Sequence, residues 1–508
     1  MTGTTRPQHA GTIEIGGMTV PYLAAGPLRP LGDGTFAAPA GGVALLHPFG
    51  DTAFYRHGWN SWSPTGWRRL SEPPLRIEND PRRTLTADDA RNDTPFVHSG
   101  SAVGAVEGPD GRVLLLGSLG LGTPRVGATE TTLWGTVERD DAEWLLAYGD
   151  EAEVFAVYAE HVAARLGSRQ TRAGRVWCSW YSFYEDISEA ALREVVEDLR
   201  GLPFDVVQID DGWERSVGDW EANAKFPSGM RTAADSIRET GAQAGLWLAP
   251  LIALPSSGFA RERPDLLVRD DDGSPLVSGY NWGSAYFTLD TTRPEVQDHL
   301  RALFARVVDW GFSYLKLDFM YAGAVAGVRS TDRHREEVYR DALALIRETV
   351  GERTYLLGSG VPMLPSAGLI DGARVGPDVA AFWDNLERPA DPSGPGAKNA
   401  LVASVHRYWL RRLYQTDPDV VYFRRRRSLL DDRQRQALQD LAAVVAFKST
   451  SDRTAWLDPQ ETDDLREWLE RTEEIGRTGR YTFTIDGRPV DLGPLVDGSA
   501  VSPSTTVN

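Results

Sequence analysis

The chain has 508 residues, of which 41% are hydrophobic and 25% charged, and its net charge at neutral pH is −18. This composition is typical of a globular protein, too apolar for a disordered chain, and disfavours nucleic acids and anionic membrane surfaces as partners. The single cysteine, Cys178, excludes an intrachain disulfide and a cysteine-rich zinc site. The sequence shows neither the pattern of a signal peptide nor an apolar run of roughly 18 residues, so we expect a cytoplasmic protein.

Residues 1–168 have the pattern of a β-sandwich. Short alternating stretches such as GTIEIGGMTVPYL (11–23) and GRVLLLGS (111–118) are separated by Gly, Pro and Asp-Gly turns. The spacing of these turns is typical of two packed antiparallel sheets. We therefore expect an N-terminal β-sandwich over residues 1–168.

From residue 169 the pattern changes to a repeated order of apolar strand, polar loop and amphipathic helix. The apolar runs predict eight strands, the last of them faint: 175–181, 204–213, 243–250, 313–319, 354–360, 373–378, 420–423 and 443–448. Capping-box pairs predict two helix starts, at Asp186 with Glu189 and at Thr292 with Glu295. Further helices are expected near 334–350, 398–414 and 431–446.

Alternating strands and helices favour a parallel sheet with helices outside. Eight units over about 300 residues suit a closed (β/α)8 TIM barrel better than an open doubly wound sheet. No strand is followed by a glycine-rich nucleotide-binding loop. We expect an α/β fold with a catalytic barrel at 169–477 and a short C-terminal β segment at 478–508.

Polar and aromatic residues recur where these strands end, which is the active face of a barrel of this kind. Six strands contribute to this set: Trp180, Tyr181, Asp210, Asp211, Trp247, Lys316, Asp318, Ser359, Arg374 and Asp378. A random scatter of polar residues would not follow strand ends.

The strand SYLKLDF is the most informative of these. With a period of two, Lys316 and Asp318 face the barrel's mouth, whereas Leu315, Leu317 and Phe319 face the helix layer. A carboxylate kept ionised by a buried cation is suited to act as a nucleophile. The chain has only four Lys against 50 Arg, so a buried Lys is notable. The alternative is an ion pair that only fixes the barrel's layers.

Asp378 offers a second carboxyl group. Pro377 interrupts the strand ARVGPD, which places Asp378 on a turn four residues after Arg374. Partial burial or the nearby charge of Asp318 would keep a proton on Asp378, as a general acid requires. The alternative is an Asp that caps a helix.

The other residues of the set suit sugar recognition. Asp210 and Asp211 can accept hydrogen bonds from sugar hydroxyls in pairs, or can form a solvated turn. Trp180 and Trp247 can stack on a pyranose ring, or can serve as core residues. The eight His show no cluster at metal-ligand spacing, and Asp270–Asp272 lack the spacing of an EF-hand loop, so no metal is expected.

Four motifs resemble the GH36 alpha-galactosidases of melibiase type: WCSWY (177–181), DDGW (210–213), LKLD (315–318) and RVGPD (374–378). The resemblance implies that Asp318 is the nucleophile and Asp378 the acid/base. It also implies galactose contacts at Asp210, Asp211, Lys316 and Arg374, with walls at Trp180, Tyr181 and Trp247. HGWNSWSP (57–64) matches a sandwich loop that lends an aromatic residue, here Trp62, to the pocket. Where the family usually has Cys near the sugar's 2-position, this chain has Ser359.

The expected activity is that of a retaining exo-glycosidase that removes terminal alpha-linked galactose through a covalent intermediate, with its two carboxyl groups about 5–5.5 Å apart. Expected partners are small oligosaccharides or alpha-galactosides, no cofactor is needed, and the family's fold allows a homo-oligomer. Alternatives with the same fold are an alpha-N-acetylgalactosaminidase and a galactosyl-transferring enzyme of raffinose-synthase kind. A non-catalytic sugar-binding protein is an alternative of another class.

Overall fold

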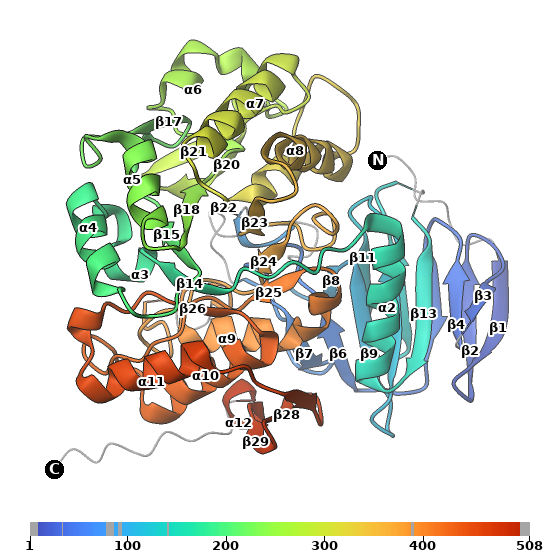
Figure 1. Cartoon of the computed structure of the whole chain (residues 1–508). Helices are drawn as coiled ribbons and strands as arrows, with labels where there is room; N and C mark the ends of the chain where they lie inside the picture. Colours follow the sequence, from blue (N-terminus) through green and yellow to red (C-terminus); the bar gives the residue numbers. More distant parts are fainter. Residues whose placement is uncertain are drawn as a thin grey trace.

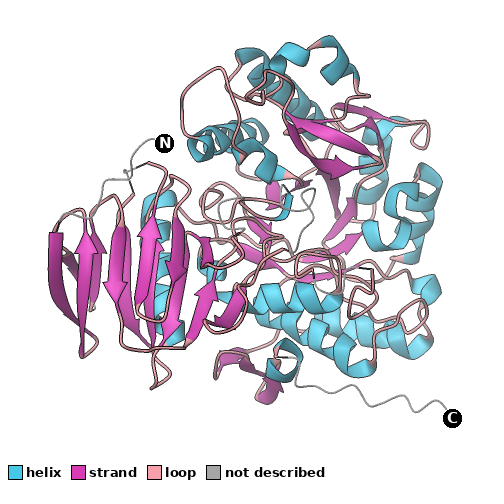
Figure 2. Cartoon of the chain, turned by 180° about the vertical axis from the view of Figure 1, so that it is seen from behind, coloured by secondary structure: helices cyan, strands magenta, loops and turns pink. Residues whose placement is uncertain are grey.

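Two packed antiparallel sheets form the N-terminal part of the computed structural model (Figures 1 and 2). The structure describes residues 9–497 except 33, 78–85, 90–93, 140–141 and 388–390. The six-stranded sheet has the order β1 (His9–Ile15), β2 (Met18–Ala24), β5 (Val43–Leu46), β12 (Thr132–Thr136), β11 (Arg125–Ala128) and β8 (His98–Ser101). The seven-stranded sheet has the order β3 (Arg29–Gly32), β4 (Thr35–Ala38), β13 (Trp144–Gly149), β10 (Val113–Ser118), β9 (Val103–Glu107), β6 (Ala53–Arg56) and β7 (Gly66–Arg69).

The two sheets bury one shared core. Apolar residues that alternate along the strands meet between them, among them Val20 and Leu45 from one sheet and Leu114 and Leu146 from the other. The alternation seen in the sequence therefore has the predicted physical cause, because every second side chain of a strand faces the core.

Residues 151–166 form helix α2 (Glu151–Leu166) and not a strand, which corrects the sequence-based prediction of an all-β segment up to 168. Asp150 caps this helix by accepting hydrogen bonds from the first-turn amides of Ala152 and Glu153. The buried side chains recur at helical spacing: Val154, Phe155, Tyr158, Ala159 and Val162. The Tyr158 hydroxyl donates a hydrogen bond to the Ser118 carbonyl at 2.8 Å, which fixes the helix on β10.

An eight-stranded parallel sheet curls through the larger part of the molecule (Figure 1). Its order is β25 (Gln415–Asp417), β24 (Gly372–Arg374), β23 (Tyr355–Gly358), β22 (Tyr314–Leu317), β18 (Gln243–Leu248), β15 (Val206–Ile209), β14 (Arg175–Cys178) and β26 (Lys448–Thr450). Just beyond β25, the Val421 amide donates to the Ser449 carbonyl at 2.8 Å and Val421 bridges Thr450 in parallel. The predicted parallel α/β sheet is thus confirmed.

Helices lie outside this sheet, as the cartoon shows (Figure 2). They are α3 (Trp180–Phe183), α4 (Glu189–Asp198), α5 (Gly229–Arg238), α6 (Gly258–Glu262), α7 (Pro294–Asp309), α8 (Arg335–Val350), α9 (Ala397–His406), α10 (Asp432–Val445), α11 (Pro459–Glu470) and α12 (Gly493–Val496). Short 3₁₀ turns are η2 (Tyr184–Asp186), η3 (Pro264–Leu266), η4 (Met320–Ala324), η5 (Tyr408–Arg412) and η6 (Thr454–Trp456). In the part of the chain that the structure describes, every helix is too short or too polar to span a bilayer.

Three small antiparallel sheets complete the architecture. They are the pair β16 (Glu214–Ser216) and β17 (Asp219–Ala222), the sheet β19 (Ile252–Ala253), β21 (Ser284–Thr288) and β20 (Val277–Asn281), and the C-terminal sheet β27 (Ile475–Arg477), β28 (Thr482–Ile485) and β29 (Arg488–Asp491). The C-terminal sheet begins at Ile475, three residues before the predicted segment, of which 498–508 lie outside the described residues.

Both predicted capping boxes are wrong. Helix α4 is capped by Ser188, whose hydroxyl accepts from the Ala191 amide, so the cap lies two residues after Asp186. Helix α7 follows Arg293 with no side-chain cap, because the Thr292 hydroxyl bonds the Asp290 carboxylate and Ser330 instead. At α4 the Ser188 hydroxyl takes the capping role expected of Asp186, and before α7 the Asp290 carboxylate accepts from both the amide and the hydroxyl of Thr292.

The last two predicted strands are displaced. The seventh strand is Gln415–Asp417, before the predicted 420–423, where only Val421 makes a bridge. Residues 443–445 belong to helix α10, because the Asp431–Gln434 capping box starts a helix that runs to Val445 and ends at Ala446 in the left-handed region. The eighth strand therefore begins only at Lys448.

Candidate active site

The candidate site lies where the parallel strands end. β15 and β22 are followed directly by acidic residues, and β25 ends with one. The carboxyl group of Asp378 comes four residues after the end of β24, and an aromatic pair follows β14 after one serine. The residues at these ends are Trp180, Tyr181, Asp210, Asp211, Asp318, Asp378, Asp417 and Asp419. Because parallel strands share one direction, their carboxyl ends meet at one edge of the sheet.

Asp318 is held by two N–H donors. The Trp247 indole nitrogen donates to Oδ2 at 3.0 Å, and the Phe319 amide donates to Oδ1 at 2.8 Å. Phe319 has φ 55°, in the left-handed region, which for a bulky residue marks a locally strained turn. The two donors stabilise the ionised carboxylate and fix its direction.

Lys316 pairs with Asp210 and not with Asp318, which corrects the pairing expected from the sequence. The Lys316 ammonium lies 2.8 Å from Asp210 Oδ2, with side-chain exposures of 8% and 2%. Gln208 also donates to Asp210, and the Asp210 amide donates to the Ser179 hydroxyl at 2.8 Å. Burial alone would lower the pKa of Lys316, but the charges of Asp210, Cys178 and Asp318 outweigh it and raise the pKa above its usual value.

Arg374 organises the other side of the site. Its Nη2 donates to Asp378 Oδ1 at 2.9 Å, to the Tyr181 hydroxyl at 3.1 Å and to Asp419 Oδ2. The Tyr181 hydroxyl also donates to Asp419, and the Val379 amide donates to Asp419 at 2.8 Å. One buried carboxylate thus fixes the guanidinium, the tyrosine and the main chain beside Asp378.

Asp378 has the electrostatics of a general acid. Its side chain is 41% exposed, and desolvation by the surrounding protein atoms raises the pKa of its carboxyl group to about 6. The cations of Arg374 and Lys316 oppose this increase, while the anions of Asp419 and Asp318 add to it. The Asp318 carboxylate is therefore close enough to Asp378 to help raise the pKa of that carboxyl group.

Asp211 forms a separate carboxyl pair. Trp282 donates its indole N–H to Asp211 Oδ2 at 2.8 Å, and the Gly212 amide donates to Glu214 at 3.2 Å. Desolvation, together with the adjacent charge and hydrogen bond of Glu214, raises the pKa of Asp211 to about 9. Asp211 Oδ1 is buried and has no hydrogen-bond partner among the described residues, so it is free to bond a ligand.

Aromatic rings form one wall beside these carboxylates. The Phe319 ring lies 5.2 Å from that of Trp62 and 5.1 Å from that of Trp282, and the Trp282 ring lies 6.3 Å from that of Trp247. Trp62 covers Gly360, where a Cβ would approach its ring to 2.9 Å. Phe319 therefore joins the site and not the helix layer, because the strand ends at Leu317.

Two predicted site residues have other surroundings. The half-buried Trp180 ring packs edge-on against Tyr184 at 5.2 Å. Ser359 is buried, and its amide donates to the Leu317 carbonyl at 2.7 Å. No hydrogen bond or ring contact within the described residues joins either side chain to Asp318 or Asp378.

Four further residues at the site were not predicted from the sequence: Asp417, Asp419, Glu214 and Trp282. The pattern Asp-Pro-Asp at 417–419 directly after a short strand could have identified the first two, had the seventh strand been placed correctly. Trp282 lies at the tip of the β20–β21 hairpin with φ 50°, and no local signal in the sequence places that tip over the sheet. Among the residues that the structure describes, no group of three or more His, Cys, Asp or Glu is arranged to hold a metal ion.

Comparison with known proteins agrees with this geometry. The Melibiase family matches residues 150–352. Curated relatives include alpha-galactosidase AgaA of Geobacillus stearothermophilus, 28% identical over 189 residues, and alpha-galactosidase Mel36A of Lactobacillus acidophilus, 26% identical over 189 residues. Each match covers 35% of this chain but only 24% of the relative, so the chain spans about a quarter of the length of these proteins.

A solved structure matches nearly the whole chain. TtGalA, an alpha-galactosidase from Thermus thermophilus in complex with p-nitrophenyl alpha-D-galactopyranoside, is 42% identical, with a TM-score of 0.90 over 96% of this chain and 100% of that one. The GH36 alpha-galactosidase AgaA has the same fold at 15% identity, with a TM-score of 0.61, 89% of this chain covered and 66% of that chain. As the four motifs predicted, the chain belongs to the melibiase-type GH36 alpha-galactosidase family.

Proposed function

We propose that this protein is a retaining exo-glycosidase that hydrolyses terminal alpha-linked galactose. The proposal depends on one observation. The carboxyl groups that follow β22 and β24 lie in one charged site, but the surroundings of one favour an anion and those of the other favour a bound proton. Asp318 receives two N–H donors, which suit an anion. Asp378 has its pKa raised to about 6, which suits a proton donor. This is the division of labour that a two-carboxylate glycosidase needs.

In the first step Asp318 attacks the anomeric carbon while the bond to the leaving oxygen breaks. Asp378 gives its proton to that oxygen, which leaves as an alcohol. In the second step Asp378, now a carboxylate, takes a proton from water, and the water oxygen displaces Asp318 from the anomeric carbon. Two inversions at one carbon retain the configuration.

Asp210, Asp211, Lys316 and Arg374 bind the galactose hydroxyl groups in this proposal. Lys316 and Arg374 supply cationic donors, and the carboxyl oxygens of Asp210 and Asp211 supply acceptors. The walls around the galactose ring are Trp62, Trp247 and Tyr181. Trp180 and Ser359 complete the proposed set of substrate-binding residues. Support for the walls comes from the chain of ring contacts that joins Trp62 to Trp247 through Phe319 and Trp282.

The architecture we propose is a closed (β/α)8 barrel at 169–477 between a sandwich at 1–168 and a C-terminal segment at 478–508. Its support is the parallel bridge between Val421 and Thr450, which joins the chain beyond β25 to β26. Substrates in this proposal are small alpha-galactosides. Cytoplasmic location and homo-oligomer formation stay predictions.

The test uses p-nitrophenyl alpha-D-galactopyranoside, with NMR detection of the first-formed anomer. We expect alpha-galactose first, and we expect Asp318→Asn to abolish turnover while the protein stays folded. Beta-galactose first would contradict retention, and near wild-type turnover by Asp318→Asn would contradict the role of Asp318. A preference for N-acetylgalactosaminides, products that appear only with an oligosaccharide acceptor, or binding without hydrolysis would each favour one of the alternatives.

A further inference from the structure

Arg407 is a completely buried arginine whose guanidinium, among the residues that the structure describes, bonds five main-chain carbonyl groups and no side chain. Its Nη1 donates to the carbonyls of Ser61 at 2.6 Å and Val375 at 2.8 Å. Its Nη2 donates to the carbonyls of Asn60 at 2.7 Å, and of Gly58 and Ser63 at 3.3 Å. None of the ion pairs within the described residues involves Arg407. Four of its five carbonyl partners lie in residues 58–63, and the fifth is Val375.

The loop that Arg407 binds, residues 58–63, carries Trp62. The Ser61 amide donates to the Val361 carbonyl at 3.1 Å, and the Met363 amide donates to the Trp59 carbonyl at 2.9 Å. These bonds hold the loop against the turn after β23, which contains Gly360 beneath the Trp62 ring. The loop from the N-terminal sheets thus reaches the end of the parallel sheet.

Val375, the remaining carbonyl partner, directly follows Arg374 on β24. Arg374 in turn binds Asp378. The same guanidinium nitrogen, Nη1, therefore connects the loop that carries the Trp62 wall with the strand end that carries the acid. A displacement of Arg407 would therefore change the position of Trp62 relative to Asp378.

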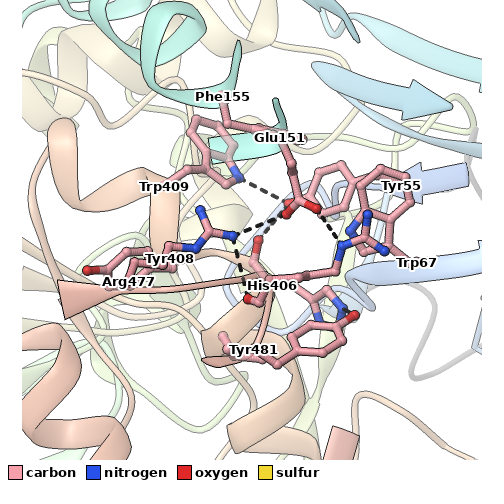
Figure 3. A pocket seen from close by; sticks show the side chains of 11 residues that line it. Tyr55, Trp67, Glu151, Phe155, His406, Tyr408, Trp409, Arg477 and Tyr481 are labelled. Carbon is pink, nitrogen blue, oxygen red and sulfur yellow. Dashed lines mark hydrogen bonds and ion pairs between the residues drawn. The ribbon is translucent and has the colours of Figure 1, made fainter. Parts of the chain in front are cut away.

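The segment around Arg407 is itself anchored, as Figure 3 shows. Its neighbours His406, Tyr408 and Trp409 line a cavity of about 10 Å³, room for about one water molecule. The Tyr55 hydroxyl donates to the His406 carbonyl at 3.0 Å and accepts from the Trp409 indole at 3.1 Å. The backbone at 406–409 is thus fixed to β6, which gives the guanidinium a rigid base.

Only arginine suits this position. Five carbonyl oxygens lie around one planar group, and a lysine ammonium has three donors at a single point. Burial without a counter-anion is costly and lowers the pKa of Arg407 to about 10. The cost is compensated by hydrogen bonds from both terminal nitrogens to oxygens that would otherwise lose their partners.

We propose that Arg407 is a positioning residue, which holds Trp62 against the galactose ring and sets that wall relative to the strand end of Asp378. The inference rests on the proposed function. It does not make Arg407 a catalytic residue, because its hydrogen bonds go to main-chain carbonyls.

The test is a double-mutant cycle of Arg407→Lys with Trp62→Ala, read as kcat and KM for p-nitrophenyl alpha-D-galactopyranoside. We expect Arg407→Lys to lower kcat/KM at least about tenfold, mainly through KM, in the wild-type background. In the Trp62→Ala background the same change should be less than about twofold, because residues that act through one another are not additive. Equal losses in both backgrounds, or a wild-type kcat/KM in Arg407→Lys, would overturn the proposal.

Gly58→Ala perturbs the same contact from the loop side, because a Cβ there would lie 2.9 Å from Arg407 Nη2 and would collide with Ser63. Gly58→Ala should also lower kcat/KM, and this loss should be smaller when it is combined with Trp62→Ala. The matched control is Arg340→Lys, since Arg340 also binds main-chain carbonyls, those of Pro365, Ala367 and Leu166, none of which belongs to the 58–63 loop. It should keep the wild-type kcat/KM.

Failure of this inference is distinguishable from failure of the proposed function. Without alpha-galactoside hydrolysis by the wild-type protein the proposed function fails, and the inference with it. If the wild-type protein hydrolyses the alpha-galactoside, the double-mutant cycle of Arg407→Lys with Trp62→Ala decides whether Arg407 positions Trp62. If Arg407→Lys and Gly58→Ala both fail to fold while Arg340→Lys folds, Arg407 serves stability, and the positioning role is overturned.

Discussion

Asp378 and Asp419 share one donor, the buried Nη2 of Arg374, which lies 2.9 Å from Asp378 Oδ1 and also bonds Asp419 Oδ2. Asp419 thereby takes up part of the positive charge that would otherwise act on Asp378. Its own negative charge also raises the pKa of Asp378. The pair explains how an acid can keep a proton next to an arginine.

Asp419→Asn should therefore lower the pKa of Asp378. Without the second anion, the full charge of Arg374 acts on Asp378 and favours its ionised form. We expect the alkaline limb of kcat/KM to move to lower pH by about one unit, with the rate at pH 5 less affected than the rate at pH 7. A pH profile of the variant measures this shift. If the alkaline limb of kcat/KM stays at the same pH or moves to a higher pH, Asp419 does not raise the pKa of Asp378.

The wild-type pH profile should itself show an acid with a pKa of about 6. Asp378 is needed in its protonated form, so kcat/KM falls about tenfold for each pH unit above that value. Asp378→Asn should remove this limb and slow substrates with poor leaving groups by about 10²–10⁴-fold. Rates for raffinose and for the p-nitrophenyl galactoside, compared in both proteins, test the role. Equal losses for both substrates would argue against proton donation to the leaving group.

Trp282→Phe keeps a ring beside Phe319 and Trp247 but removes the N–H that donates to Asp211. A hydrogen bond to a carboxyl group contributes about 1–2 kcal/mol, so we expect KM to rise about fivefold to thirtyfold with a smaller change in kcat. The matched control is Trp310→Phe, whose ring packs on Trp213 at the end of α7. A wild-type KM in Trp282→Phe would mean that Asp211 does not depend on this donor.

Lys316→Met leaves Asp210 as a buried anion without its cation. Removal of one partner of a buried ion pair costs about 3–5 kcal/mol, so the free energy of unfolding in urea should fall by that amount. Adding Asp210→Asn should recover part of the loss, because the uncompensated charge disappears. If the single and double variants are equally unstable, Lys316 stabilises the fold mainly by packing.

Much of the site could be predicted because strand ends are local features. Asp318, Asp210 and Asp378 each follow an apolar run, and a parallel sheet brings such positions together whatever the loops do. The pairing of charges could not be predicted. Lys316 faces both Asp210 and Asp318, and only the register between β22, β18 and β15 decides that its ammonium bonds Asp210.

The two misplaced helical segments both follow an aspartate cap. Helix α2, capped by Asp150, is rich in the helix formers Ala and Glu, whereas the end of α10 suits either a strand or a helix and is helical because the helix that starts after Asp431 continues to Val445. Trp282 and Arg407 act at long range, from a hairpin tip and from a segment between α9 and η5. A periodic pattern of apolar residues predicts local helices and strands, but it does not predict such long-range contacts.

The role of Asp318 as nucleophile is tested most directly by the mass of the protein after reaction with a fluorinated galactosyl fluoride. This reagent carries a good leaving group, but its ring fluorine slows release of the covalent intermediate. We expect one fluorogalactosyl adduct, on the peptide that contains Asp318, in protein that has lost activity. An adduct on a different carboxyl group, or inactivation with no adduct, would contradict it.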